Sequence, residues 1–165
     1  MRSLGPTLTP TLVERLAQHD LASRLGVAIP FITVDVGGSP HPMLLSYLEV
    51  RAYSATTVGL VIQARSGSAR NLAQRGVGTL LVLEPDANVY VKTRLVDGPL
   101  PVDDALDLGL GYFLLEVQDV LEDAATEWEG AAGITSPIRY QPVPRLDEPW
   151  VKATLRALEM PRARA

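Results

Sequence analysis

The stretch ARSGSARNLAQRG, residues 64–76, stands between two apolar segments that are typical of strands, VGLVIQA before it and VGTLLVLE after it. Ser66 and Ser68 are residues that cap helices, and Gly76 is suited to ending one, so a short helix is predicted between two strands. The start of a helix carries unpaired N–H groups and a partial positive charge. The stretch therefore has two interpretations: a plain connection with a capped helix, or a pocket for an anion.

Further strands are expected on both sides of this stretch. Short apolar or alternating segments predict six strands or so, at 27–36, 41–54, 58–64, 77–84, 89–96 and 112–123. The first two are separated by a glycine-containing turn and predict a β-hairpin. Antiparallel strands at this spacing favour a closed or partly closed β-barrel, because a barrel leaves fewer unpaired strand edges than an open sheet.

Helices are expected to flank these strands. The N-terminal helix is predicted at about 10–25, with Thr9 as its cap, and the C-terminal helix at about 149–160, stopped by Pro161. The proline-rich residues 97–104 predict a break after the fifth strand. Residues 136–144 also contain prolines, which confine them to a short edge piece at most.

Composition limits the classes of function. The 165 residues suit one domain, 1–165, and the formal net charge of −4 disfavours nucleic acid as the main partner. There are no cysteines, which excludes disulfides and thiolate chemistry, and the two histidines fall in different elements, so no metal site is expected. No apolar run approaches the length of a membrane span, so we expect no membrane partner and a cytoplasmic protein.

Common catalytic signatures are missing from the sequence. It contains no GxxxxGK[ST] loop, no GxGxxG after a strand and no GxSxG elbow. His41, between Pro40 and Pro42, is interpreted as a surface turn residue rather than a catalytic one. No catalytic residue can be named from these patterns.

The chemistry around the predicted helix start suits a phosphate. A strand ends near Gln63, and serine hydroxyls and arginine side chains that could bond phosphate oxygens follow it. The candidate binding residues are Gln63, Arg65, Ser66, Ser68, Arg70 and Asn71. The same residues would also serve as a helix cap and solvated arginines, so the residues alone leave both interpretations open.

The run from FITVDVGGSPHPMLLSY through IQARSGSARNLAQRGVGTLLV to YVKTRLV resembles the pyridoxamine 5'-phosphate oxidase-like proteins, the FMN-binding split-barrel family. The resemblance covers roughly residues 27–120. Ser66 matches the serine of the family's S-x-K-x-x-N-L type segment, and Asn71 and Leu72 match its N-L pair. Ser68 stands where the family usually has a lysine, and Arg65 or Arg70 could supply the missing charge.

The resemblance implies a mainly β fold, a six-stranded antiparallel split β-barrel with flanking helices. It also implies a homodimer with FMN between the subunits, and its phosphate near Ser66, Ser68 and Asn71, with Gln63 at the strand end. The leading hypothesis is an FMN-dependent oxidoreductase acting on a small-molecule substrate. The alternatives are a non-catalytic protein that binds a flavin, haem or other ligand, and a structural or interaction protein without flavin.

Overall fold

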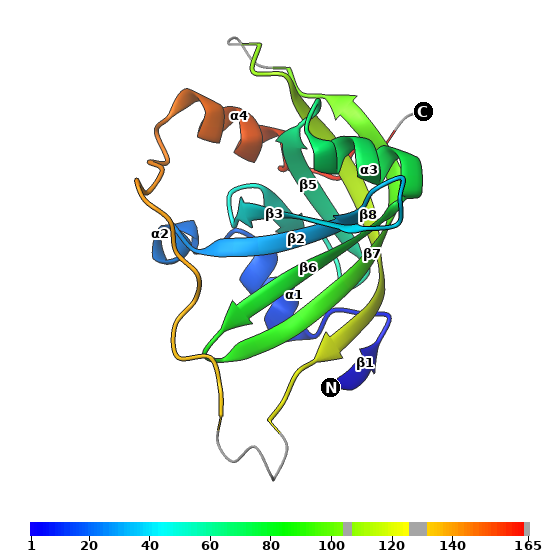
Figure 1. The fold of residues 1–165 in the computed structure, drawn as a ribbon. Coiled ribbons are helices and arrows are strands. Elements are labelled where there is room, and N and C mark those ends of the chain that lie inside the picture. The colour runs from blue at the N-terminus through cyan, green and yellow to red at the C-terminus, as the bar shows by residue number, and fades with distance from the viewer. Residues whose placement is uncertain (104–106, 126–131, 164–165) are drawn as a thin grey trace.

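The computed structural model describes residues 1–103, 107–125 and 132–163, and it consists mainly of antiparallel β-strands (Figure 1). The strands are β1 (Arg2–Gly5), β2 (Ala28–Val34), β3 (Pro40–Ser46), β4 (Val50–Ala52), β5 (Thr57–Gln63), β6 (Val77–Glu84), β7 (Ala87–Pro101) and β8 (Leu110–Glu122). The helices are α1 (Pro10–Leu16), α2 (Leu21–Arg24), α3 (Gly67–Arg75) and α4 (Pro149–Ala157).

The eight strands of the described residues belong to one curled sheet. Its order is β3-β2-β6-β7-β8-β5-β4, with β1 paired to β8. The two strands at the ends of this order, β3 and β4, follow each other in the chain with only residues 47–49 between them. The sheet therefore bends round until its two ends are joined by a tight turn, which makes an incompletely hydrogen-bonded barrel. The predicted class, a mainly β barrel with flanking helices, is confirmed.

The core fills the inside of the curled sheet. Alternation along the strands supplies its side chains: in β7, Val89, Val91 and Thr93 are buried while Lys92 and Arg94 are exposed. Helix α1 contributes Leu12 and Leu16 to this core, and α3 contributes Leu72. The two helices thus cover different parts of the barrel interior.

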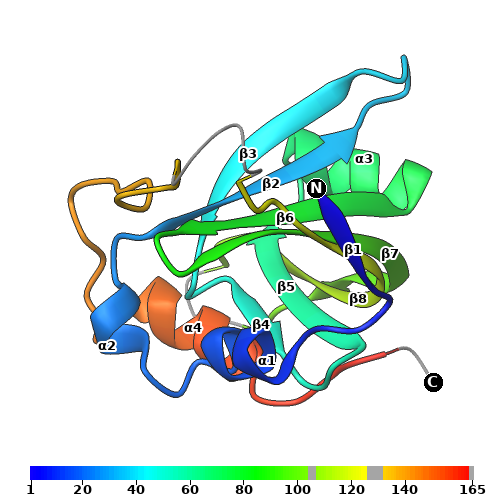
Figure 2. The same ribbon diagram turned by 90° about the horizontal axis from the view of Figure 1, so that it is seen from below.

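Helix α4 packs outside this core. It belongs to a separate apolar cluster in which Ala157 and Leu158 meet Val61, Tyr112 and Leu114 of β5 and β8. These strand residues alternate with core residues such as Phe113, so α4 lies on the outer face of the sheet. Figure 2 shows α1, α2 and α4 on one side of the molecule and α3 beside the projecting β2–β3 hairpin.

The strand count differs from the six that were predicted. The predicted return strand at 41–54 is divided into β3 and β4, because the Glu49 carboxylate accepts hydrogen bonds from the backbone N–H and the hydroxyl of Ser46, at 2.7 and 2.8 Å. This side chain closes a turn where a strand ladder would otherwise continue. The other additional strand, β1, pairs with β8 through a register shift between Ser3 and Gly5.

The N-terminal helix predicted at about 10–25 is two short helices. Helix α1 ends at Leu16, and Gln18 adopts a left-handed backbone conformation with φ of 67°. Its side-chain amide donates to the carbonyl oxygens of Tyr47, Leu48 and Val50 at 2.9–3.2 Å. A non-glycine residue at positive φ is unfavourable, so these contacts with the β3–β4 turn hold the interruption in place.

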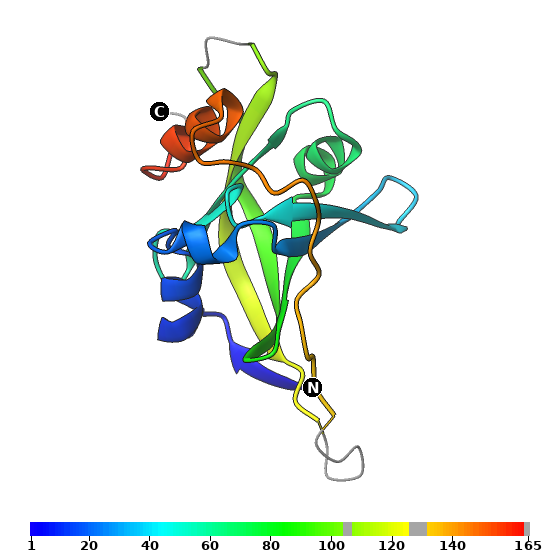
Figure 3. The ribbon, with the colours of Figure 1, turned by 90° about the vertical axis from the view of Figure 1, so that its left-hand side faces the viewer.

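Two other boundaries differ from those predicted, while residues 136–144, expected to be a short edge piece at most, form a single bridge. Strand β7 continues through most of the expected break at 97–104, with register irregularities between Leu95 and Pro101 that accommodate its prolines; residue 104 lies outside the described part. Residues 136–144 form only an isolated bridge, Val27 with Arg139, and Figure 3 shows their segment running along one side of the molecule. Helix α4 ends at Ala157, because the Leu158 N–H turns back to the carbonyls of residues 154–156.

Within the described residues, no helix is long and apolar enough to cross a membrane.

Candidate functional site

The candidate site lies where β5 passes into α3. Gln63 is the last residue of β5, and after a tight turn Ser66 caps α3 by accepting a hydrogen bond from the Ala69 N–H at 3.1 Å. Gly76 ends the helix with φ of 68°, and its N–H donates to the Leu72 carbonyl at 2.8 Å. The capped helix predicted here is confirmed. Ser66 accepts the N–H of Ala69, and no acceptor is found among the described residues for the N–H groups of Gly67 and Ser68 at the helix start.

The candidate residues divide between two sides of this helix. Gln63, Arg65 and Arg70 are exposed, and Ser66 is partly buried at the helix start. Arg70 folds back, so that its Nη1 donates to the Arg65 carbonyl at 2.7 Å. The Gln63 amide is also occupied, because it donates to the Leu108 carbonyl at 2.8 Å. Arg65 is therefore the cation with the greatest freedom to reach an anion at the helix start.

Ser68 and Asn71 lie on the inner side of α3. Ser68 is 1% exposed and Asn71 is 8% exposed. The Asn71 side-chain amide donates to the Thr33 hydroxyl at 3.2 Å, and the Thr33 hydroxyl donates to the His41 carbonyl at 3.3 Å. Asn71 thus connects α3 to both strands of the β2–β3 hairpin. This contact gives Asn71 a role in placing the helix start.

His41 is the residue of this site that the sequence interpretation missed. It lies inside β3, paired with Thr33 in β2, and its imidazole packs against the first residue of α3. A methyl group added to Gly67 would come within 2.8 Å of His41 Nε2. The available signal was the combination of a hairpin that brings His41 back towards the helix and a glycine at the first helical position.

A hollow adjoins the helix start on the Arg65 side. It has a volume of about 330 Å³, and its lining is mostly apolar. Arg65 and Asp107 are its charged residues, and Pro99, Leu100 and Leu110 belong to its apolar wall. The site therefore combines a helix start rich in donors with an apolar recess at the same end of the barrel.

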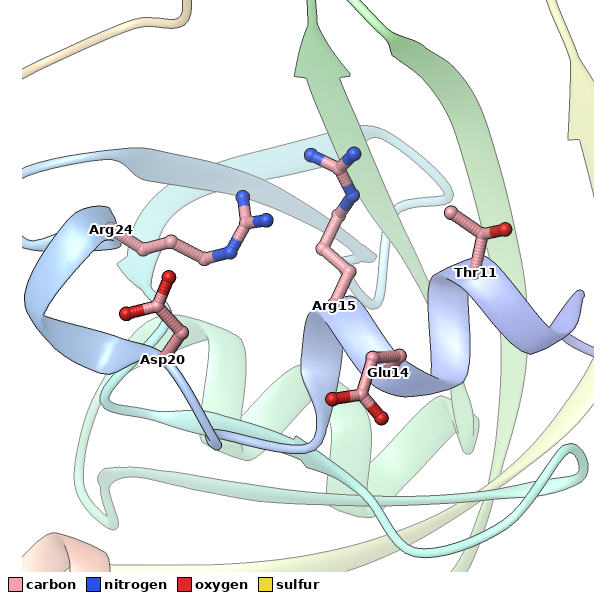
Figure 4. A pocket seen from close by; sticks show the side chains of 5 residues that line it. All are labelled: Thr11, Glu14, Arg15, Asp20 and Arg24. Carbon is pink, nitrogen blue, oxygen red and sulfur yellow. The ribbon is translucent and has the colours of Figure 1, made fainter.

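A second hollow, of about 500 Å³, lies beside α1 and α2 and is lined by Thr11, Glu14, Arg15, Asp20 and Arg24 (Figure 4). Its arginines are already paired with a carboxylate from β6. The Glu84 carboxylate lies 3.0 Å from Arg15 Nη1 and 3.0 Å from Arg24 Nη1. It also accepts a hydrogen bond from the Tyr47 hydroxyl. Burial and the hydrogen bond to Glu84 raise the pKa of Tyr47. We assign this cluster a structural role because both of its arginines are paired with carboxylates, Glu84 for Arg24 and Glu84 and Asp86 for Arg15.

Several solved structures match this architecture. A candidate pyridoxamine 5'-phosphate oxidase from Lactobacillus delbrueckii matches with a TM-score of 0.56 and 14% identity, over 73% of this chain and 99% of that one. An FMN-binding protein from Syntrophomonas wolfei matches at 0.53 and 15%, over 70% and 88%. A candidate flavin reductase with a split barrel domain, from Shewanella frigidimarina NCIMB 400, matches at 0.50 and 14%, over 86% and 93%.

The fold is the split barrel. The resemblance drawn from the sequence is thereby confirmed for the architecture, although no protein-family model and no curated protein matches the chain. In this split barrel, α3 lies beside the β2–β3 hairpin. Whether each of the candidate residues contacts a cofactor stays a prediction.

Proposed function

We propose that this split barrel binds FMN and uses it as an oxidoreductase for a small molecule. The observation that carries the proposal is the start of α3, which Ser66 caps and which the exposed Arg65 directly precedes. A helix start favours anions, and arginine adds charge-assisted hydrogen bonds to phosphate. The flavin binding named for structural neighbours supports the same ligand.

The residues at this site fit a phosphate group. Arg65 would supply the positive charge that the family usually obtains from lysine at the Ser68 position, where Ser68 itself is buried. Ser66 would hold the helix start in place while its backbone neighbours donate. The apolar hollow beside Arg65 offers a surface for an uncharged part of a ligand.

FMN, when bound, would supply the electron-transfer chemistry, and the chain would supply binding and orientation. The proposal therefore requires no acid or base in the protein. The substrate class is a small molecule that exchanges electrons with the flavin.

We further propose that two copies pair through the outer face of β2, β3 and β6, in a cytoplasmic homodimer. This face carries Leu44 and Val77, which are 57% and 40% exposed, and the half-buried Ile32 and Val34. In an antiparallel sheet whose outer face meets water, polar side chains usually alternate with core residues. Apolar side chains on both faces of β2 therefore support contact with another protein surface.

The test begins with the visible spectrum of the purified protein and with its uptake of added FMN. Yellow protein, or saturable uptake of FMN, would support the cofactor. Colourless protein that takes up no FMN would contradict it. Anaerobic addition of NADH or NADPH then separates the two flavin hypotheses: bleaching of the bound flavin supports an oxidoreductase, while no bleaching with either donor favours a protein that binds flavin without turnover.

A further inference from the structure

We propose that a hollow on the outer face of the sheet, lined by Lys92 and Arg94 of β7, binds a small aromatic carboxylate. The inference goes beyond the proposed function, because it requires neither FMN nor the pairing of two copies. This β7 hollow has a volume of about 300 Å³. Its apolar wall includes Ile32 and Val34 of β2 and Val77 of β6.

Neither cation of the β7 hollow forms an ion pair within the described residues. Both side chains are exposed on the outer face, because they alternate with the buried Thr93. The strand register places Asp119 of β8 opposite Lys92, and it places Glu116 opposite Arg94. Opposite charges in such cross-strand positions usually attract. The missing ion pairs therefore have a cause in the neighbouring strands.

Neutral donors bind both of these carboxylates instead. Glu116 accepts a hydrogen bond from the side-chain amide of Gln118 at 2.8 Å. Asp119 accepts one from the hydroxyl of Ser3 in β1 at 2.7 Å. The carboxylates thus have partners of their own, and the two cations of β7 remain available to an anion from solution.

A β-bulge places one of these donors. Lys92 pairs with Asp119 of β8. The next residue, Thr93, pairs with Val117, so Gln118 is an extra residue in β8. Its exposed side chain lines the β7 hollow. Bulges redirect side chains and are frequent next to functional sites, so this irregularity supports a site here.

The chemistry of the lining favours an anion with an apolar body. The planar guanidinium of Arg94 matches the two oxygens of a carboxylate, and Lys92 adds a second charge beside it. The apolar wall would remove an aromatic ring from water. The volume lies at the lower end of the range of small-molecule pockets, which favours a compact ligand.

The β7 hollow is separate from the phosphate site proposed above. That site lies at the start of α3, whereas Val77 in the wall of the hollow directly follows Gly76, which ends α3. The hollow shares its apolar wall with the face proposed for pairing, but its cations lie on β7, beyond that face. All of its lining residues belong to one copy of the chain.

The test measures binding of naphthoate to the purified protein by isothermal titration calorimetry. Naphthamide has the same rings without the charge, and acetate has the charge without the rings. We expect saturable binding of naphthoate and at least about ten-fold weaker binding of the other two. Arg94→Gln and Lys92→Gln, both at exposed positions, should each weaken naphthoate binding about ten-fold, as for loss of a charge-assisted hydrogen bond.

Lys152→Gln is the matched control, because Lys152 is the other lysine of the sequence and is exposed on α4. It should leave the affinity unchanged, and so should Leu44→Glu on the face proposed for pairing, because the site lies within one copy. A loss of naphthoate affinity in either of these two variants would overturn the inference.

Three further results would also overturn it: no binding of naphthoate, equal affinity for naphthoate and naphthamide, or unchanged affinity in both Arg94→Gln and Lys92→Gln. Displacement of naphthoate by FMN would place the two ligands in one site and overturn the separate site. Naphthoate binding that depends on both cations, in a protein that takes up no FMN, would support this inference and contradict the proposed function alone.

Discussion

Asn71 in α3 donates its side-chain amide to the Thr33 hydroxyl in β2 across 3.2 Å, and both residues are buried. This bond joins the candidate phosphate-binding helix to the barrel. We expect Thr33→Val to leave the Asn71 amide buried without this partner and to lower the free energy of unfolding by about 1–3 kcal/mol. Urea unfolding measures the change. Gln74→Ala, an exposed change on the same helix, should stay within about 0.5 kcal/mol of the wild type.

The Glu84 carboxylate stabilises the region where α1 and α2 meet β6. We expect Glu84→Gln to lower the free energy of unfolding by about 2–4 kcal/mol, since it leaves the Arg15 guanidinium buried with only Asp86 as a charged partner. Chemical denaturation checks this value. Asp147→Asn removes an exposed partner of Arg145 and should leave the free energy of unfolding unchanged. Equal losses of stability in the two variants would contradict the claim that burial makes the Glu84 ion pairs important.

Glu49 gives the stability of the protein a pH dependence. Burial raises the pKa of its carboxyl, while hydrogen bonds from Ser46 oppose part of that rise. The folded state therefore binds the proton more tightly than the unfolded state does. The contribution of Glu49 to stability is fully present below its unfolded pKa and is lost as pH rises through the folded pKa.

We accordingly expect Glu49→Gln to flatten this part of the stability profile, because glutamine accepts the Ser46 bonds without carrying a charge. The free energy of unfolding, measured from pH 4 upward, should increase for the variant relative to the wild type as pH rises. A constant difference between the two proteins at every pH would contradict the raised pKa.

If two copies pair through the outer face of the sheet, a substitution on that face should change the mass of the protein in solution. We expect Leu44→Glu to convert dimers into monomers, because it places a charge at the centre of an apolar contact, while the folded monomer tolerates it at an exposed position. Sedimentation velocity measures the mass. Met160→Glu, a change of the same kind at a side chain that is 71% exposed after α4, should leave the dimer intact. A wild-type monomer would contradict the proposed pairing.

The sequence was sufficient for those elements whose signals are local. Strand β6 runs from Val77 to Glu84 as predicted, because its apolar run is bounded by Gly76 and Pro85. Helix α3 was predicted from Ser66 and Gly76, which act as its cap and its end. The candidate cluster at this junction follows from the same local signals.

The remaining features depend on contacts between distant residues. The interruption at Gln18 requires carbonyls some thirty residues away, in the β3–β4 turn. The position of His41 at the helix start requires the hairpin register and the space over Gly67. The inward orientation of Asn71 requires Thr33 as its partner. Local patterns do not contain these pairings, so the sequence indicated the capped helix start and not the residues that pack against it.

The dissociation constant of FMN for Arg65→Ala tests the central claim most directly. Arg65 is exposed, so its removal should leave the fold intact, and Arg2→Ala provides a control at an exposed arginine in β1. A phosphate held at the start of α3 predicts about a ten-fold loss of FMN affinity for Arg65→Ala, with unchanged riboflavin affinity and an unchanged control. FMN affinity equal to that of the wild type would show that the phosphate does not bind there.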